Sequence, residues 1–178
     1  PNAVVTVLQG LGADFQLPVL LVQHITPSFL AGFAAWLNDV CPLEVVIAED
    51  GQTVLGGRVY LAPPDRHLEV DGACMRVRDE PPVDGQRPSG TVLLRSLARS
   101  LGRRAIGVVL TGMGEDGALG LKALREAGGY TIAEDSSTAV VYGMPAVAMR
   151  LGAASEQLPL PQIAGRLREI SGPARVAP

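Results

Sequence analysis

Short apolar runs alternate with amphipathic stretches along the whole chain. The apolar runs are rich in Val, Ile and Leu and are bounded by Gly, Pro or charged residues, as buried strands are; they lie at 17–25, 43–49, 105–112 and 130–135. The amphipathic stretches predict helices at 1–12, 28–40, 87–102, 118–128, about 145–151 and 160–171. Residues 57–77 predict short strands and turns, because Gly and Pro punctuate them. This alternation is typical of an α/β fold in which helices cover a mostly parallel sheet.

The first predicted element is a helix, which is unusual for a doubly wound α/β fold, since such a helix normally follows a strand. We therefore expect a strand and a loop ahead of Pro1. The length of 178 residues suits one domain with a single core, and neither an internal repeat nor a long linker divides it. We expect residues 1–178 to form that domain, with a loose tail from about 172 to 178.

Composition narrows the class of protein. Hydrophobic residues make up 47% and charged residues 19%, and the net charge of −3 comes without a run of Lys or Arg. Nucleic acid and anionic membranes are therefore poor candidates as partners. No apolar run is long enough to span a bilayer, and the N-terminus does not have the layout of a signal peptide. The two cysteines, Cys41 and Cys74, have no metal-ligand spacing, so we expect buried thiols, no metal and a reducing cytoplasm.

Two residues lie at the carboxyl ends of predicted strands, where the binding and catalytic residues of open α/β sheets are usually found. His24 ends the strand-like run "VLLVQH", and Asp116 lies in the loop just after the run "AIGVVLTG". A histidine base held by an aspartate is a recurring hydrolytic pair. The alternative is a structural histidine at a strand end and a carboxylate that stabilises a helix start.

A nucleophile is harder to find within the chain. Ser28 and Ser89 precede predicted helices and suit N-caps, and Ser136 and Ser137 suit a turn. None lies on a sharp strand-to-helix elbow of the kind that activated serines favour. The second histidine, His67, lies among turns beside Asp65 and Arg66 and is a candidate wall of a site rather than a base.

A glycine motif offers a rival interpretation. Gly112, Gly114 and Gly117 spell G-x-G-x-x-G between a predicted strand and helix, and Glu134 or Asp135 ends the next strand about where a ribose-binding acid belongs. Such a loop binds the pyrophosphate of a dinucleotide. Glu115 and Asp116 argue against it, because two carboxylates facing a pyrophosphate would cancel the attraction of the helix N-terminus.

Taken in order, several segments resemble the catalytic domain of the chemotaxis protein-glutamate methylesterase family, CheB. They are "VLLVQHI", "VYLAPPDRHL", "RPSGTVLLRSLA", "VVLTGMGEDGALGL" and "TIAEDSSTAVVYGMPAVA". The resemblance covers nearly the whole chain, from about residue 3 to about 170. It implies a three-layer, Rossmann-like α/β fold and hydrolysis of glutamyl methyl esters on chemoreceptor helices by a Ser–His–Asp triad. It also implies deamidation of receptor glutamines, as in many members, and no metal or organic cofactor.

Carried over residue by residue, the resemblance makes His24 the base and Asp116 its orienting acid. Gly112 and Met113 would support the oxyanion loop, with Met113 presenting a backbone N–H. The family's serine turn has no match, because it precedes the first helix of this sequence, so we expect the nucleophile upstream of Pro1. The family's receiver domain has no counterpart in the chain either. A non-catalytic scaffold that binds receptors, and a dinucleotide-binding domain, remain the alternatives.

Overall fold

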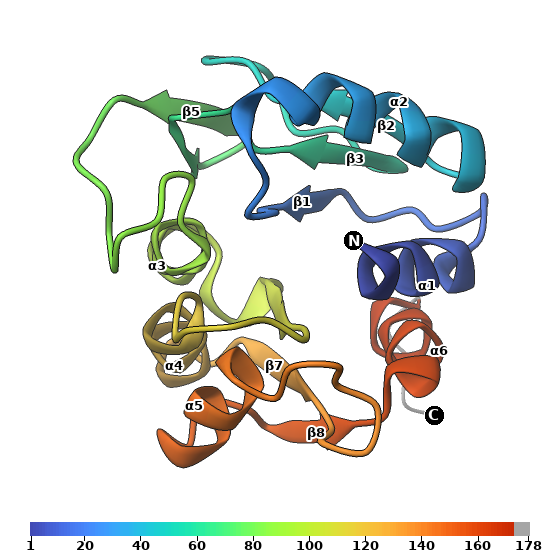
Figure 1. The fold of residues 1–178 in the computed structure, drawn as a ribbon, viewed down its shortest axis with the longest axis vertical. Coiled ribbons are helices and arrows are strands. Elements are labelled where there is room, and N and C mark those ends of the chain that lie inside the picture. The colour runs from blue at the N-terminus through green and yellow to red at the C-terminus, as the bar shows by residue number, and fades with distance from the viewer. Residues whose placement is uncertain (173–178) are drawn as a thin grey trace, which may run out of the picture.

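The strands form two parallel three-stranded sheets and one antiparallel hairpin in the computed structural model, which describes residues 1–172 (Figure 1). The strands are β1 (Val19–Leu21), β2 (Glu44–Ile47), β3 (Arg58–Leu61), β4 (His67–Asp71), β5 (Cys74–Arg78), β6 (Ile106–Val109), β7 (Tyr130–Glu134) and β8 (Glu156–Leu158). One parallel sheet has the order β1-β3-β2 and the other β6-β7-β8, while β4 and β5 form the hairpin. The connections β1–β2, β6–β7 and β7–β8 each contain a helix, as crossovers between parallel strands usually do, whereas residues 48–57 join β2 to β3 through turns.

Helices cover both faces of the sheets and so make three layers (Figure 1). They are α1 (Asn2–Leu11), η1 (Pro27–Phe29), α2 (Leu30–Val40), α3 (Gly90–Ser100), η2 (Gly102–Arg104), α4 (Ala118–Glu126), α5 (Met144–Arg150) and α6 (Leu160–Ser171). One hydrophobic cluster joins α1, α2 and α6 to residues such as Val59 and Ile132, and the other joins α3, α4, α5 and the hairpin to Tyr60 and Ala133. Neighbouring residues of a strand thus face opposite layers, as the strand period requires.

Each parallel sheet has an outer strand, β1 in one and β6 in the other, whose second edge carries no hydrogen-bonded ladder among the described residues. Among the described residues, β1 pairs only with β3, and β6 only with β7. Their other edges lie toward the middle of the molecule, where Figure 1 also places the N-terminus. Val19, Leu21, Ile106 and Val108 of these strands are only partly buried at the margin of the first cluster. Parallel strands are normally covered on both faces, so the described residues cover these side chains incompletely.

Several predicted boundaries were wrong, for local reasons. The strand expected at 17–25 is short because its partner β3 ends at Leu61, opposite Leu21. Ser28 is not an N-cap: it lies inside η1, and α2 begins only at Leu30. Gly102 does not cap α3 but begins η2, and β8 was not predicted at all.

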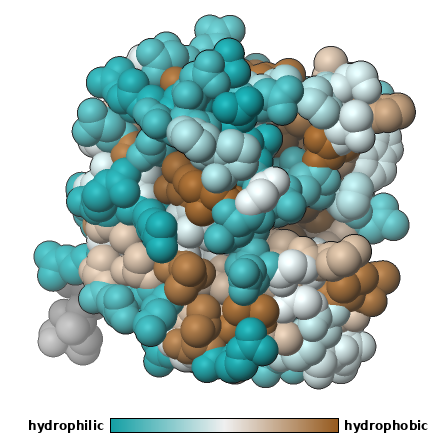
Figure 2. Space-filling model, turned by 60° about the vertical axis from the view of Figure 1, so that its left-hand side comes forward, coloured by the Kyte–Doolittle hydropathy of each residue, from teal (hydrophilic) through white to brown (hydrophobic). Residues whose placement is uncertain are grey.

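The surface is a mixture of polar residues and small apolar areas. Figure 2, which brings the side of α3, α4 and α5 forward, shows hydrophobic patches interrupted by hydrophilic residues. None of the helices within residues 1–172 has the length and apolar character needed to cross a lipid bilayer. Cys41 is buried and Cys74 half-buried, and neither forms a disulfide. Except for Gly172, the tail expected at 172–178 lies outside the described residues.

Candidate active site

His24 and Asp116 lie 92 residues apart in the sequence and form a direct hydrogen bond in the structure. His24 follows β1 by three residues, and Asp116 lies in the loop between β6 and α4. The Nε2–H of His24 donates to Oδ2 of Asp116 at 2.8 Å. The Asp116 side chain is 3% exposed and that of His24 is 28% exposed. The pair therefore has a buried acid and an imidazole that reaches solvent.

The Asp116 carboxylate is held by the N-terminus of α3, a helix from another part of the chain. Oδ1 accepts from the Ser89 hydroxyl at 2.6 Å and from Thr91 N–H at 3.0 Å, while Oδ2 also accepts from Gly90 N–H at 2.6 Å. The first N–H groups of a helix have no partner within the helix and favour an anion. Asp116 is thus a carboxylate at a helix start, but the helix is α3 rather than the α4 that follows it in sequence.

These contacts decide the charge of Asp116. Burial by itself raises the pKa of the carboxyl, but hydrogen bonds from His24, Ser89, Thr91 and Gly90 outweigh burial, and the pKa lies well below its usual range. Asp116 is therefore ionised at neutral pH. An ionised carboxylate requires a proton on Nε2 of His24, so the lone pair of the neutral ring is on Nδ1, which has no hydrogen-bond partner within residues 1–172. An available lone pair beside an ionised carboxylate is what a general base needs, and the use of His24 as that base stays a prediction.

The glycine loop between β6 and α4 is tied to the loop after β7. Gly112 N–H donates to Val141 O at 3.1 Å, and Met144 N–H donates to Gly112 O at 2.8 Å. Gly114 and Gly117 have φ values of 90° and 85°, a region that glycine adopts without strain. These turns bring the chain sharply back so that Asp116 points inward while Met113 stays 83% exposed.

Gly112 and Met113, the two residues expected to support an oxyanion, differ in whether their backbone N–H is already hydrogen-bonded. The Gly112 N–H is engaged by Val141 O, so it supports the loop and is not a free donor. The Met113 N–H has no hydrogen-bond partner among residues 1–172. Only Met113 of the two therefore presents a backbone donor, and its use by an oxyanion stays a prediction.

Glu134 has a buried structural position that the sequence did not reveal. Its carboxylate accepts from Thr111 N–H at 2.7 Å and from the Thr138 hydroxyl at 3.1 Å. It therefore joins the glycine loop to the segment after β7 and does not face outward as a ribose-binding acid would. Glu115 is exposed, and Asp116 points into the protein. This geometry does not favour the dinucleotide alternative.

The remaining residues that the sequence singled out form no hydrogen bond with His24 or Asp116 among the described residues. His67 is the first residue of β4 and is buried, so it is not an exposed wall of the site. Arg66 pairs with Asp79 rather than with the neighbouring Asp65 carboxylate. Ser137 lies in a turn closed by its N–H to Asp135, as expected for a turn serine. Within the described part of the chain, no three His, Cys, Asp or Glu side chains are placed to share a metal ion.

Sequence reasoning missed that Ser89 and Thr91 contact the acid. Ser89 was expected only to cap α3, which it does by accepting from Val92 N–H, yet its hydroxyl also donates to Asp116. Thr91 contributes twice, because its N–H donates to Asp116 and its hydroxyl oxygen accepts from Gly117 N–H at 2.8 Å. The available signal was the run "SGT" at a helix start, which offers several donors to an anion.

The fold and the pair together define a class: an α/β protein with a buried aspartate that orients a histidine at the carboxyl edge of its parallel strands, as serine hydrolases have. The comparison with known families is specific. The family model described as CheB methylesterase matches residues 1–167, and the chain belongs to this family.

Curated proteins similar to this chain carry names that agree with this family. A protein-glutamate methylesterase/protein-glutamine glutaminase of Paramagnetospirillum magneticum is 56% identical over 96% of this chain and 49% of its own length. One of Anaeromyxobacter dehalogenans is 47% identical over 96% of this chain and 50% of its own length. This chain thus spans about half the length of the curated relatives it matches. A crystal structure of the CheB methylesterase catalytic domain of Thermotoga maritima matches with a TM-score of 0.91 and 34% identity, covering 96% of this chain and 92% of that one. The expected family and the three-layer α/β fold are confirmed.

Proposed function

We propose that this protein hydrolyses glutamyl methyl esters on the methylated cytoplasmic helices of chemoreceptors, using His24 as general base and Asp116 as its orienting acid. The observation that carries the proposal is the 2.8 Å hydrogen bond between His24 and a buried, ionised Asp116. The names of the relatives give the ester class. A receiver domain on the same polypeptide and a cytoplasmic location belong to the same proposal.

The nucleophile in this proposal is a serine from a strand that pairs with β1 and β6. Both strands have one edge without a ladder among the described residues, and both edges lie toward the middle of the molecule. A parallel strand inserted there would end at the same edge of the sheet as the segments that carry His24 and Asp116. A serine in the turn after that strand would meet the free Nδ1 of His24.

The reaction is acyl transfer in two steps. The serine Oγ attacks the ester carbonyl carbon while Nδ1 of His24 takes the hydroxyl proton, and Asp116 stabilises the imidazolium that results. The carbon–methoxide bond then breaks, and His24 returns the proton to the leaving oxygen to give methanol. Water next attacks the acyl-serine, again with His24 as base, and releases the glutamate carboxylate and the serine hydroxyl.

Met113 supplies an oxyanion donor in this scheme. Its N–H has no partner within residues 1–172, whereas that of Gly112 is engaged. One such donor is worth roughly 3–4 kcal/mol of transition-state stabilisation in serine hydrolases. Gly112 and its contacts to the loop after β7 hold the Met113 peptide in place.

Deamidation of receptor glutamines is the second activity that we propose, because the same relatives carry "glutaminase" in their names. The acyl-serine is identical for the ester and the amide, and His24 donates its proton to the leaving amide nitrogen in place of the leaving methoxide oxygen. That proton goes to the amide nitrogen as its bond to carbon breaks, so the nitrogen leaves as ammonia, and the chemistry needs no additional residue.

Methanol release from methylated chemoreceptor, catalysed by the intact protein as its gene encodes it, tests the proposal. We expect His24→Ala to lower kcat by about 10⁴-fold or more. Ser28→Ala is the matched control, because Ser28 lies four residues from His24, is exposed and is not the proposed nucleophile. Full activity in H24A would refute the base, and loss of activity in S28A would refute the external serine. Receptor binding by a wild-type protein that releases no methanol would favour the scaffold alternative.

A further inference from the structure

His67 contacts Ser89, the residue whose hydroxyl holds Asp116, and does so at the Ser89 backbone nitrogen. The imidazole is 1% exposed. Its Nε2 lies 3.0 Å from Pro81 O, and its Nδ1 lies 3.2 Å from the backbone nitrogen of Ser89. A carbonyl oxygen only accepts and an N–H only donates, so the proton of the neutral ring is on Nε2 and the lone pair is on Nδ1.

Ser89 connects this imidazole to the carboxylate of the site. Its N–H donates to His67, and its hydroxyl donates to Asp116 at 2.6 Å. The next two N–H groups, of Gly90 and Thr91, also donate to Asp116. The backbone at Ser89 therefore sets where three of the four donors to Asp116 lie, and His67 is the acceptor that holds this backbone from behind.

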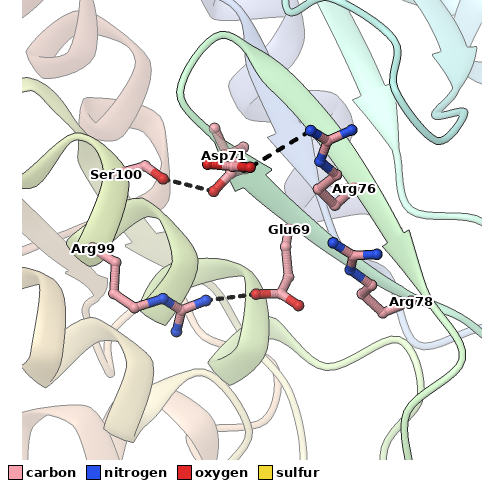
Figure 3. A pocket seen from close by; sticks show the side chains of 7 residues that line it. Glu69, Asp71, Arg76, Arg78, Arg99 and Ser100 are labelled. Carbon is pink, nitrogen blue, oxygen red and sulfur yellow. Dashed lines mark hydrogen bonds and ion pairs between the residues drawn. The ribbon is translucent and has the colours of Figure 1, made fainter.

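The rest of α3 is fixed against the same hairpin strand that carries His67. The Ser96 hydroxyl oxygen accepts from Val70 N–H at 2.9 Å, and the Ser100 hydroxyl donates to Val70 O at 2.8 Å. Arg99 and Glu69 form an ion pair at 2.6 Å beside a pocket of about 370 Å³ (Figure 3). These contacts hold the middle and the far end of the helix. His67 makes the corresponding contact at the end that binds Asp116.

We propose that His67 is a positioning residue for the reaction: through Ser89 it fixes the N-terminus of α3, and thereby Asp116 and the ring of His24. This inference rests on the proposed function, since it gives His67 a part in the same reaction. Imidazole suits the position because its rigid ring accepts at Nδ1 and donates at Nε2. His67 touches no reacting atom in this scheme.

Two substitutions test the contributions of the two ring nitrogens of His67 separately. In His67→Asn the side-chain oxygen takes the place of Nδ1 and still accepts from Ser89 N–H. In His67→Gln the amide reaches toward Pro81, and the Ser89 N–H loses its acceptor. We expect H67Q to lower kcat for methanol release about 10- to 100-fold with KM unchanged, as a small displacement of a catalytic group does. H67N should retain kcat within a few-fold of wild type.

Ser96→Ala is the control for a merely structural effect. Ser96 is a fully buried serine of the same helix whose hydroxyl contacts β4 but not Asp116. S96A should lower the urea midpoint and leave kcat unchanged. A loss of kcat in H67Q no greater than in S96A, or an H67N variant as impaired as H67Q, would overturn the inference.

The ¹⁵N NMR spectrum of the imidazole nitrogens gives an independent test, because residues 1–178 contribute only two histidines to it. We expect His67 to carry its proton on Nε2 and to have an unprotonated Nδ1. A proton on Nδ1 would contradict the inference directly, and the measurement needs no substitution, so it decides even where H67Q fails to fold. An inactive wild-type protein with the expected tautomer would instead refute the proposed function.

Discussion

Replacing Asp116 by asparagine keeps the shape of the side chain and removes the charge on which the site depends. Asn has one acceptor oxygen and one NH₂ group, whereas both oxygens of Asp116 accept hydrogen bonds. Oδ1 receives Thr91 N–H and Oδ2 receives Gly90 N–H. Whichever oxygen is replaced, one buried N–H of α3 faces an NH₂ group and loses its acceptor.

The expected loss of stability follows from these bonds. A hydrogen bond to a charged group contributes about 1.5–3 kcal/mol, and an orphaned buried donor costs about 1–3 kcal/mol. A neutral amide is cheaper to bury than a carboxylate, which offsets part of this loss. We expect Asp116→Asn to lower the free energy of unfolding at pH 7 by about 2–4 kcal/mol, measured by urea denaturation.

The expected loss of activity is larger. An amide NH₂ at the Oδ2 position favours a proton on Nδ1 of His24, which removes the lone pair that would accept the serine proton. In serine proteases the corresponding change lowers kcat about 10⁴-fold, and we expect a similar loss of methanol release here. Asp71→Asn is the control, because Asp71 is 73% exposed and its pair with Arg76 is 3.6 Å long. D116N with wild-type kcat, or D71N as impaired as D116N, would refute this reasoning.

The same carboxylate makes stability depend on acid pH. The pKa of Asp116 is lower in the folded protein than its ordinary value of 3.8, so the unfolded chain binds the proton more readily. The stabilisation is complete above that ordinary value and is lost as the pH falls below it toward the folded pKa. We expect urea midpoints to fall more steeply below pH 4 in wild type than in D116N. Parallel curves for the two proteins would contradict the assignment.

Two other predictions concern regions outside the pair. A methyl group added at Gly143 would lie 2.6 Å from Gly112 O, so Gly143→Ala should displace the glycine loop and lower kcat by about 10²-fold, whereas Gly165→Ala, with open space around it, should not. Equal kcat values for both variants would contradict a supporting role for this loop. The Arg168 guanidinium holds the pKa of Asp14 at about 2, and Arg168→Gln should return it toward 3.8 in a ¹³C NMR titration; an unchanged value would show that the ion pair is not formed in solution.

The alternation of apolar and amphipathic segments predicted most of the fold, because buried parallel strands and covering helices have different periods. This pattern failed where tertiary contacts determine whether a strand forms and where it ends. β8 (Glu156–Leu158) has too few apolar residues to be recognised and forms because β7 offers it an edge. β1 ends early because β3 does, which only the register reveals.

The site was partly predictable for the same reason. His24 and Asp116 could be found because the carboxyl ends of parallel strands gather in space, and the structure joins them at 2.8 Å. The sequence could not indicate that Asp116 binds the start of α3 rather than that of α4, because the residues concerned are 25 to 27 positions apart. His67 was expected to be a wall, and its burial behind Ser89 likewise depends on how the hairpin packs on α3.

The most direct test of the account is to locate the serine that His24 activates. The intact protein would be treated with a fluorophosphonate, which reacts with activated serines, and the labelled peptide identified by mass spectrometry. The account predicts one labelled serine, outside residues 1–178, and no labelling in His24→Ala. A label on a serine within residues 1–178, or labelling that persists in H24A, would contradict it.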